Sequence, residues 1–172
     1  MSHQFRGTGV ALVTPFRQDE TVDYDALGKL VDHVIAGGVN YLVALGTTAE
    51  TPVLSAEEKR DVLSFIIEKN NGRVPVVCGV GGNNTAEVVH QLRTWNLEGV
   101  SGILSVAPYY NKPGQEGIYR HFKTIAEATD KSLILYNVPG RTSSNILPAT
   151  ALRLAGEFPH IVAIKEASGN MS

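Results

Sequence analysis

Cysteine is almost absent from the 172-residue sequence: Cys78 is the only one, so an internal disulfide is excluded. Neither sign of charge dominates, because 15 Lys and Arg residues face 17 Asp and Glu residues. No basic patch or like-charge run offers a surface for nucleic acid. Apolar stretches stay well short of the ~20 residues that cross a membrane, and the first residues lack an apolar signal core. We therefore expect a soluble cytoplasmic protein with neither nucleic-acid nor membrane partners.

Several catalytic signatures are also missing from the sequence. The five histidines show no metal-ligand spacing, so we expect no metal. No nucleophile elbow or cysteine–histidine pairing is visible. The glycine-rich segment 79–84 lacks the lysine of a phosphate-binding loop, and we interpret it as a strand-to-helix turn.

The sequence does contain a regular alternation of short apolar runs with amphipathic segments. The runs are rich in Val, Ile and Leu, as in strands buried on both faces of a parallel sheet. They are Val10–Val13, Tyr41–Leu45, Val74–Cys78, Gly102–Val106, Leu133–Tyr136 and Ile161–Ile164. Their starts recur at roughly 30 residues, the size of one βαβ unit.

The amphipathic segments predict five helices between these strands. They begin near Asp23, Ser55, Asn84, Gln115 and Pro148. Glutamate stands three residues after both Ser55 and Asn84, which is the spacing of a capping box. The first helix should stop at Gly37-Gly38.

Two architectures fit the alternation, an open doubly wound sheet and a (β/α)8 barrel. The nucleotide-binding glycine pattern of the open sheet does not follow the first strand. Polar residues instead end several strands: Thr14, Thr47, Thr48, Tyr136 and Lys165. Such a gathering at strand ends favours the barrel. Because eight units need about 250 residues, we expect only about the first six strands and five helices, from a fragment or from a chain that a partner completes.

Lys165 is the principal candidate for chemistry, because it ends the apolar run Ile161–Ile164. Apolar surroundings lower the pKa of a lysine from about 10.4 and leave an amine that attacks a ketone. The alternative is a solvated loop lysine, or one paired with Glu166. Tyr136 ends the neighbouring strand, where a phenol can carry protons. Its alternative role is to cap the core.

Three other segments could contact a substrate or a partner. Thr47 and Thr48 follow Gly46 in a turn whose hydroxyl and N–H groups suit a carboxylate, although ordinary turn chemistry also explains them. Arg141 lies on a loop shaped by Pro139-Gly140, from which it could bind a carboxylate or simply extend into solvent. The Tyr109-Tyr110 pair indicates packing or an interface.

Five motifs together resemble one family over essentially the whole chain. They are GVALVTPF at 9–16, GTTAE at 46–50, PYYNKP at 108–113, YNVPGRT at 136–142 and IKEASGN at 164–170. They are similar to the dihydrodipicolinate synthase branch of the N-acetylneuraminate lyase family, which are class I pyruvate aldolases. The resemblance implies a (β/α)8 barrel of which residues 1–172 form the N-terminal portion of a single domain. The last two βα units and a C-terminal helical domain would be absent.

The resemblance also implies a lyase reaction without a cofactor. Lys165 would form a Schiff base with pyruvate, and the derived enamine would attack L-aspartate 4-semialdehyde, at the entry to diaminopimelate and lysine biosynthesis. Tyr136 would relay protons, with Thr47 linking it to Tyr110. Thr48 would hold the pyruvate carboxylate.

The remaining implied residues concern specificity, assembly and regulation. Arg141 would bind the semialdehyde carboxylate; sialate lyases of the family lack this arginine and have Ser-Thr in place of Thr47-Thr48. Tyr110 would come from a neighbouring subunit, which implies a homo-oligomer built as a dimer of dimers. Ala49 stands where the family usually has glycine.

An allosteric lysine site would draw on Asn83, Glu87 and Tyr109. Ala56 and Lys59 replace histidines that are frequent in feedback-inhibited members, which argues against inhibition by lysine. Two alternatives stay open, an aldolase of the same family that acts on a sugar acid, and a truncated non-catalytic subunit.

Overall fold

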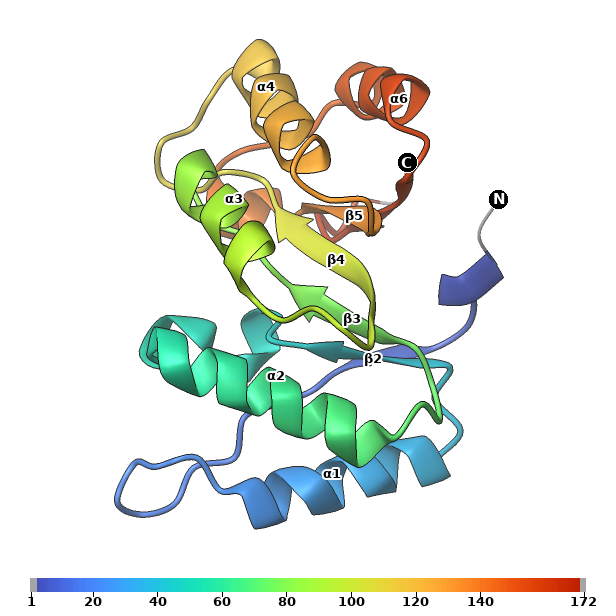
Figure 1. Ribbon diagram of the computed structural model, residues 1–172. Coiled ribbons are helices and arrows are strands. Elements are labelled where there is room, and N and C mark those ends of the chain that lie inside the picture. Colours follow the sequence, from blue (N-terminus) through green and yellow to red (C-terminus); the bar gives the residue numbers. More distant parts are fainter. Residues whose placement is uncertain (1–2, 171–172) are drawn as a thin grey trace. The chain divides into compact units, whose positions relative to one another are not determined.

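The computed structural model describes residues 3–170, which divide into two compact units (Figure 1). The first unit contains the residues up to Gly79 together with Asn96–Ser101, and the second contains Val80–Trp95 and the residues from Gly102 onward. The expected domain spans residues 1–172, of which 1–2 and 171–172 lie outside the described residues. Strands follow chain order within each unit, β1–β2–β3 and β4–β5–β6.

The first unit alternates strands with helices as expected. Its elements are η1 (His3–Phe5), β1 (Gly9–Ala11), α1 (Tyr24–Ala36), β2 (Tyr41–Ala44), η2 (Thr47–Ala49), η3 (Thr51–Val53), α2 (Ala56–Asn70) and β3 (Val76–Gly79). Both strand pairs are parallel. Helices α1 and α2 lie side by side (Figure 1).

The second unit repeats the alternation. Its elements are α3 (Thr85–Thr94), β4 (Val100–Val106, whose first two residues belong to the first unit), α4 (Gln115–Ala126), β5 (Ser132–Asn137), α5 (Pro139–Thr142), α6 (Pro148–Glu157) and β6 (Ile161–Glu166). Strand β5 pairs in parallel with β4 and with β6. Helix α4 contacts both α3 and α6 (Figure 1).

The predicted helix starts are confirmed by hydrogen bonds of the capping side chains. Asp23 accepts a bond from the third residue of α1. Ser55 and Glu58 form the reciprocal capping box at the start of α2. Asn84 accepts two N–H bonds from the first turn of α3. Each side chain satisfies backbone donors that the helix itself leaves unpaired.

Apolar side chains from strands and helices form the core of each unit. Fully or almost fully buried residues of the first unit include Leu27, Val31, Leu42, Val62, Ile66, Val76 and Val77. Those of the second include Ile103, Phe122, Ile125, Leu133, Leu135 and Leu154. Cys78 is also fully buried, and this burial raises the pKa of its thiol to about 12.

Three expectations are corrected by the structure. The segment around Arg141 was expected to be a loop, but Pro139 begins a single helical turn, α5, because proline suits the first position of a helix. Strand β6 was expected to be buried on both faces, yet only Ile161 is buried and Ile164 is 42% exposed. The reason is that β6 is the last strand of its sheet and pairs on one side only, with β5. The first strand, β1, was expected to be buried in the same way and is not, because it pairs only with β2.

Candidate functional site

Tyr136 and Lys165 occupy paired positions on the neighbouring strands β5 and β6. Because paired residues of a parallel sheet point to the same face, the two side chains meet. The Lys165 ammonium nitrogen lies 4.5 Å from the centre of the Tyr136 ring. Tyr136 itself is 8% exposed. The structure thus brings the two principal candidate residues together.

Partial burial lowers the pKa of Lys165. Although the side chain is exposed along part of its surface, neighbouring atoms withdraw the amine from water, and this burial lowers the pKa of Lys165 below its usual range. The expected direction of the shift is confirmed. The expected apolar surroundings of Lys165 are only partly present, because Ala163 and Ile164 on the same strand are themselves exposed.

The next pair of residues along the two strands, Asn137 and Glu166, forms a polar cluster on the opposite face of the sheet. The Asn137 side-chain amide donates to the Glu166 carboxylate (2.8 Å). That carboxylate also accepts a bond from the Ser168 N–H (2.7 Å). The hydrogen bond from Asn137 is the main cause that lowers the pKa of Glu166. The Glu166 carboxylate therefore bonds to Asn137 and Ser168, whereas one alternative had paired it with Lys165.

Asn137 also fixes the segment that follows β5. Its amide donates to the Asn145 side chain (2.8 Å), and its carbonyl oxygen Oδ1 accepts a bond from the Ile146 N–H (2.9 Å). These bonds span the one-turn helix α5, which carries the exposed residue Arg141. Asn137 was not among the residues predicted to have a role. Its position directly after Tyr136 in the YNVPGRT motif was the sequence feature that could have indicated one.

Thr47 and Thr48 lie in the first unit, on the short helix η2 that follows β2. Both are exposed, and their N–H groups open the helical turn, where such donors lack intrahelical partners. Leu45 before the turn has a φ of +53°, and Glu50 after it has +55°. A left-handed leucine is strained, and such strain clusters at functional sites. This unusual backbone was not visible in the sequence.

Two further features hold the η2 turn in place. The buried Thr14 hydroxyl donates to the Ala49 carbonyl oxygen at 2.8 Å, which ties the segment after β1 to the turn. Ala49 is itself buried and is not among the residues with positive φ, so its methyl group is accommodated where the family usually has glycine. Thr14, from the end of the first strand, therefore stabilises the turn that contains Thr47 and Thr48, from the end of the second strand.

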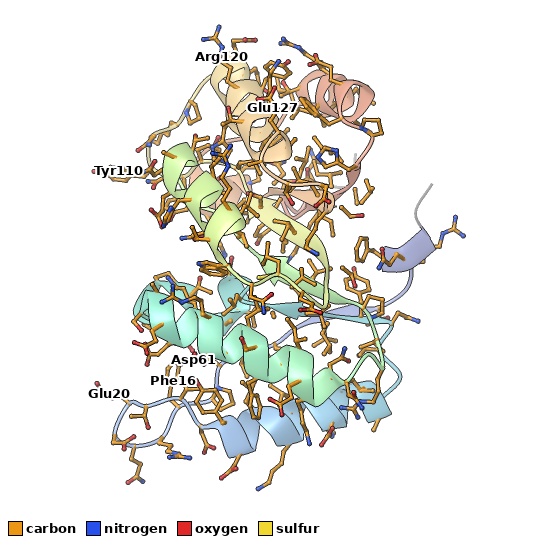
Figure 2. All side chains as sticks on the ribbon, in the orientation of Figure 1. Phe16, Glu20, Asp61, Tyr110, Arg120 and Glu127 are labelled. Atoms are coloured by element: carbon orange, nitrogen blue, oxygen red, sulfur yellow. The ribbon has the colours of Figure 1, made fainter. Side chains whose placement is uncertain are left out.

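The tyrosine pair lies on the segment after β4 in the second unit. Tyr110 is 87% exposed with a φ of +68°, and it projects away from the ribbon (Figure 2). Tyr109 is 42% exposed. The Asn111 side chain donates to the Asn83 carbonyl oxygen at 3.1 Å, which brings this segment to the start of α3. Glu87 lies in the first turn of that helix and is exposed.

Within residues 3–170 no group of three or more His, Cys, Asp and Glu side chains is arranged to hold a metal ion. None of the helices in this range combines the length and apolar character needed to cross a bilayer.

Comparisons with known proteins identify the family of this chain. The model of the Dihydrodipicolinate synthetase family matches residues 4–172. The 4-hydroxy-tetrahydrodipicolinate synthases of Parabacteroides distasonis and Flavobacterium psychrophilum are 58% and 59% identical to the chain, each over 97% of it. The chain spans 56% and 57% of the length of these two curated relatives.

Solved structures give the same result. The dihydrodipicolinate synthase of Aquifex aeolicus is 44% identical, with a TM-score of 0.92 over 97% of this chain and 57% of its own. The chloride-inhibited dihydrodipicolinate synthase of Acinetobacter baumannii, complexed with pyruvate, is 48% identical, with a TM-score of 0.91 over 95% of this chain and 56% of its own. The expected fold class, about the first six strands of a (β/α)8 barrel, is confirmed. The chain belongs to the Dihydrodipicolinate synthetase family.

Proposed function

We propose that the protein carrying this chain condenses pyruvate with L-aspartate 4-semialdehyde through a Schiff base, the first committed step of diaminopimelate and lysine biosynthesis. The observation that carries the proposal is the Lys165 amine, with its lowered pKa, 4.5 Å from the Tyr136 ring centre. The names of the relatives support it, as does the pyruvate bound to one solved member of the family. The reaction needs no cofactor.

The proposed chemistry begins with the neutral amine of Lys165. Its lone pair attacks the keto carbon of pyruvate to give a carbinolamine, which loses water to form an imine. Removal of a methyl proton converts the imine to an enamine, whose carbon attacks the aldehyde. The Tyr136 phenol would carry protons in these steps, because it lies beside the amine on the adjacent strand.

The other residues would bind substrate groups or complete the relay. Thr48 would hold the pyruvate carboxylate with donors of the η2 turn, and Thr47 would link Tyr136 to Tyr110. Arg141 would bind the carboxylate of the semialdehyde, since its guanidinium is exposed at the end of α5. The lysine-binding role of Asn83, Glu87 and Tyr109 remains a second proposal, supported by the Asn111 bond that joins their two segments.

We also propose that the working protein is a cytoplasmic homo-oligomer, a dimer of dimers, in which Tyr110 enters the site of a second copy. The 87% exposure of this aromatic ring supports such a contact. One relative is described as the first monomeric dihydrodipicolinate synthase variant, so subunit number is a quantity to measure. Residues 1–172 would form the N-terminal portion of a single barrel domain, with the last two βα units and a C-terminal helical domain outside this chain.

Reductive trapping tests the central step. Treatment of the protein with pyruvate and borohydride should attach a three-carbon adduct to Lys165, which peptide mass spectrometry locates. The adduct should be missing from the Lys165→Met variant. An unmodified mass for the wild-type protein at saturating pyruvate would refute the proposal.

The Arg141→Ala variant tests whether Arg141 binds the semialdehyde, as opposed to a sugar-acid substrate. This variant should still form the pyruvate adduct but should lose most of its condensation with the semialdehyde. Arg120→Ala provides the matched control, because Arg120 is an exposed arginine of the same unit that pairs with Glu116 on α4. Unchanged condensation in Arg141→Ala would contradict the proposed role of Arg141 in binding the semialdehyde.

A further inference from the structure

Strand β6 contains one more residue than β5 needs for regular pairing. Leu133 pairs with Ile161, but the next residue of β5, Ile134, pairs with Ala163, so Val162 is the extra residue. Such a bulge shifts every later residue of its strand by one position relative to the partner. Downstream of the bulge, Tyr136 pairs with Lys165.

Regular pairing would place the lysine on the wrong face. Without the extra residue, Tyr136 would face Ile164, and Lys165 would pair with Asn137. Since side chains alternate between the two faces, Lys165 would then lie on the face opposite to Tyr136. The encounter between amine and phenol therefore depends on the bulged register.

Within residues 3–170, hydrophobic burial does little to select that register. A strand with one buried apolar face resists a slip of one residue, because the slip exposes the whole apolar set. In β6, however, Val162 is half-buried, and Ala163 and Ile164 are exposed. Within this chain, the end of β6 is held instead by polar interactions.

We propose that Asn137 is a positioning residue, which selects the bulged register and so presents Lys165 to Tyr136. Its side chain is 1% exposed, and its bond to Glu166 forms because these two residues are paired in that register. The backbone adds one bond, from the Ala167 N–H to the Asn137 carbonyl oxygen at 2.8 Å. This role deepens the proposed function and rests on it.

The bonds of Asn137 also explain why an amide is required. Nδ2 donates to two oxygens, those of Glu166 and Asn145, while Oδ1 accepts the Ile146 N–H. An aspartate in its place would have the same shape but would turn an acceptor, with its charge, toward the Glu166 carboxylate. An unpaired buried acceptor beside a like charge is strongly unfavourable. Asn137→Asp should therefore release the end of β6.

A reversed pair provides the rescue. In Asn137→Asp/Glu166→Gln, the new glutamine amide can donate to the new aspartate while its oxygen still accepts the Ser168 N–H. The new aspartate keeps an oxygen for the Ile146 N–H, and the Asn145 amide can rotate to donate. The double variant thus restores the bonds with donor and acceptor exchanged.

The readout is the reactivity of Lys165, measured on the whole gene product in two ways. Competitive labelling by acetic anhydride reports the amine without pyruvate, and borohydride trapping reports imine formation. We expect both rates to fall about tenfold or more in Asn137→Asp, as for loss of one charge-assisted hydrogen bond, and to recover in the double variant. Thr142→Val is the matched control: it removes buried bonds of Thr142 to Val138 and Ser144 in the same segment without touching β6, and should leave both rates unchanged.

Glu166→Ala covers the case in which Asn137→Asp fails to fold, because Glu166 is exposed and its loss is tolerated more easily. It too should slow Lys165 labelling. Wild-type labelling rates in Glu166→Ala or Asn137→Asp, or no recovery in the double variant, would overturn the positioning role. If wild-type protein gives no pyruvate adduct, the proposed function fails, while the labelling series still decides whether Asn137 positions the amine.

Discussion

The hydroxyl of Thr85 lies 2.8 Å from Nδ1 of His121, which joins the first residue of α3 to the middle of α4. His121 is only 4% exposed. Burial lowers the pKa of this imidazole to about 4, and the nearby Val106 backbone opposes the shift only in part. The neutral form of His121 is therefore the one that the folded second unit accommodates.

We expect acid to destabilise the second unit through this histidine. The pKa of His121 is lower in the folded state than the 6.5 of an unperturbed histidine, so the unfolded state binds the proton first. The contribution of neutral His121 to the free energy of unfolding is complete above pH 6.5 and is lost as the pH falls toward 4. The pKa difference corresponds to about 3 kcal/mol over that window.

Denaturant unfolding at pH 7, 5.5 and 4 measures this effect, with His121→Gln as the variant that cannot titrate. The free energy of unfolding of the wild type should fall toward that of the variant as the pH decreases. His90→Gln is the control, since His90 lies exposed on α3. A constant difference between wild type and His121→Gln would contradict the prediction.

Removal of the Tyr136 hydroxyl should slow turnover while leaving the ring beside Lys165. We expect kcat of Tyr136→Phe to fall by about 10²–10⁴, the usual contribution of a general acid or base. Steady-state kinetics measures the change. Tyr119→Phe is matched to it, because Tyr119 is a buried tyrosine of the same unit whose hydroxyl donates to Glu157 at 2.6 Å. Equal effects of the two substitutions on kcat would contradict a role of Tyr136 in proton transfer.

The capping box of α2 gives a prediction about stability alone. Ser55→Ala removes the acceptor for the Glu58 N–H and should lower the free energy of unfolding by about 1 kcal/mol. Ser64→Ala, at an exposed interior position of the same helix, should raise it by a few tenths, since alanine has the higher helix propensity. Chemical denaturation of both variants checks the opposite signs.

Gly79 lies where a side chain cannot fit. A methyl group at this position would clash with the Leu45 carbonyl oxygen, which belongs to the backbone and cannot rotate away. Gly79→Ala should therefore cost about 1–3 kcal/mol, as overpacking does. Gly156→Ala, where nothing lies within 4 Å of the added carbon, should instead stabilise α6 by about 0.5 kcal/mol. Thermal unfolding that shifts both variants in the same direction would contradict the steric argument.

Local signals in the sequence were sufficient for the elements and for one part of the site. The side chains of Asp23, Ser55 and Asn84 fix helix starts within a few residues, so their positions could be predicted. The placement of Tyr136 and Lys165 at the ends of adjacent strands was also predictable, because carboxyl ends of parallel strands share one edge.

Interactions between distant residues could not be predicted in the same way. Regular strand pairing would have set Tyr136 against Ile164, and nothing in the residue pattern of β6 marks Val162 as extra. The strained φ of Leu45 arises from the backbone around the η2 turn rather than from a glycine that a reader could recognise. Exposure of β6 was missed because an apolar run indicates a buried strand only when other strands flank it.

The thiol of Cys78 is shielded from solvent. Its burial disfavours the thiolate, which is the form that reacts with alkylating reagents. Since residues 1–172 contain no other cysteine, a thiol introduced at the surface would be the only reactive thiol of this chain toward a maleimide dye. Tyr110→Cys would place such a dye on the most exposed aromatic position, where its fluorescence anisotropy could follow assembly of subunits in real time. The buried sulfur thus leaves the chain ready for single-site spectroscopy without a prior background mutation.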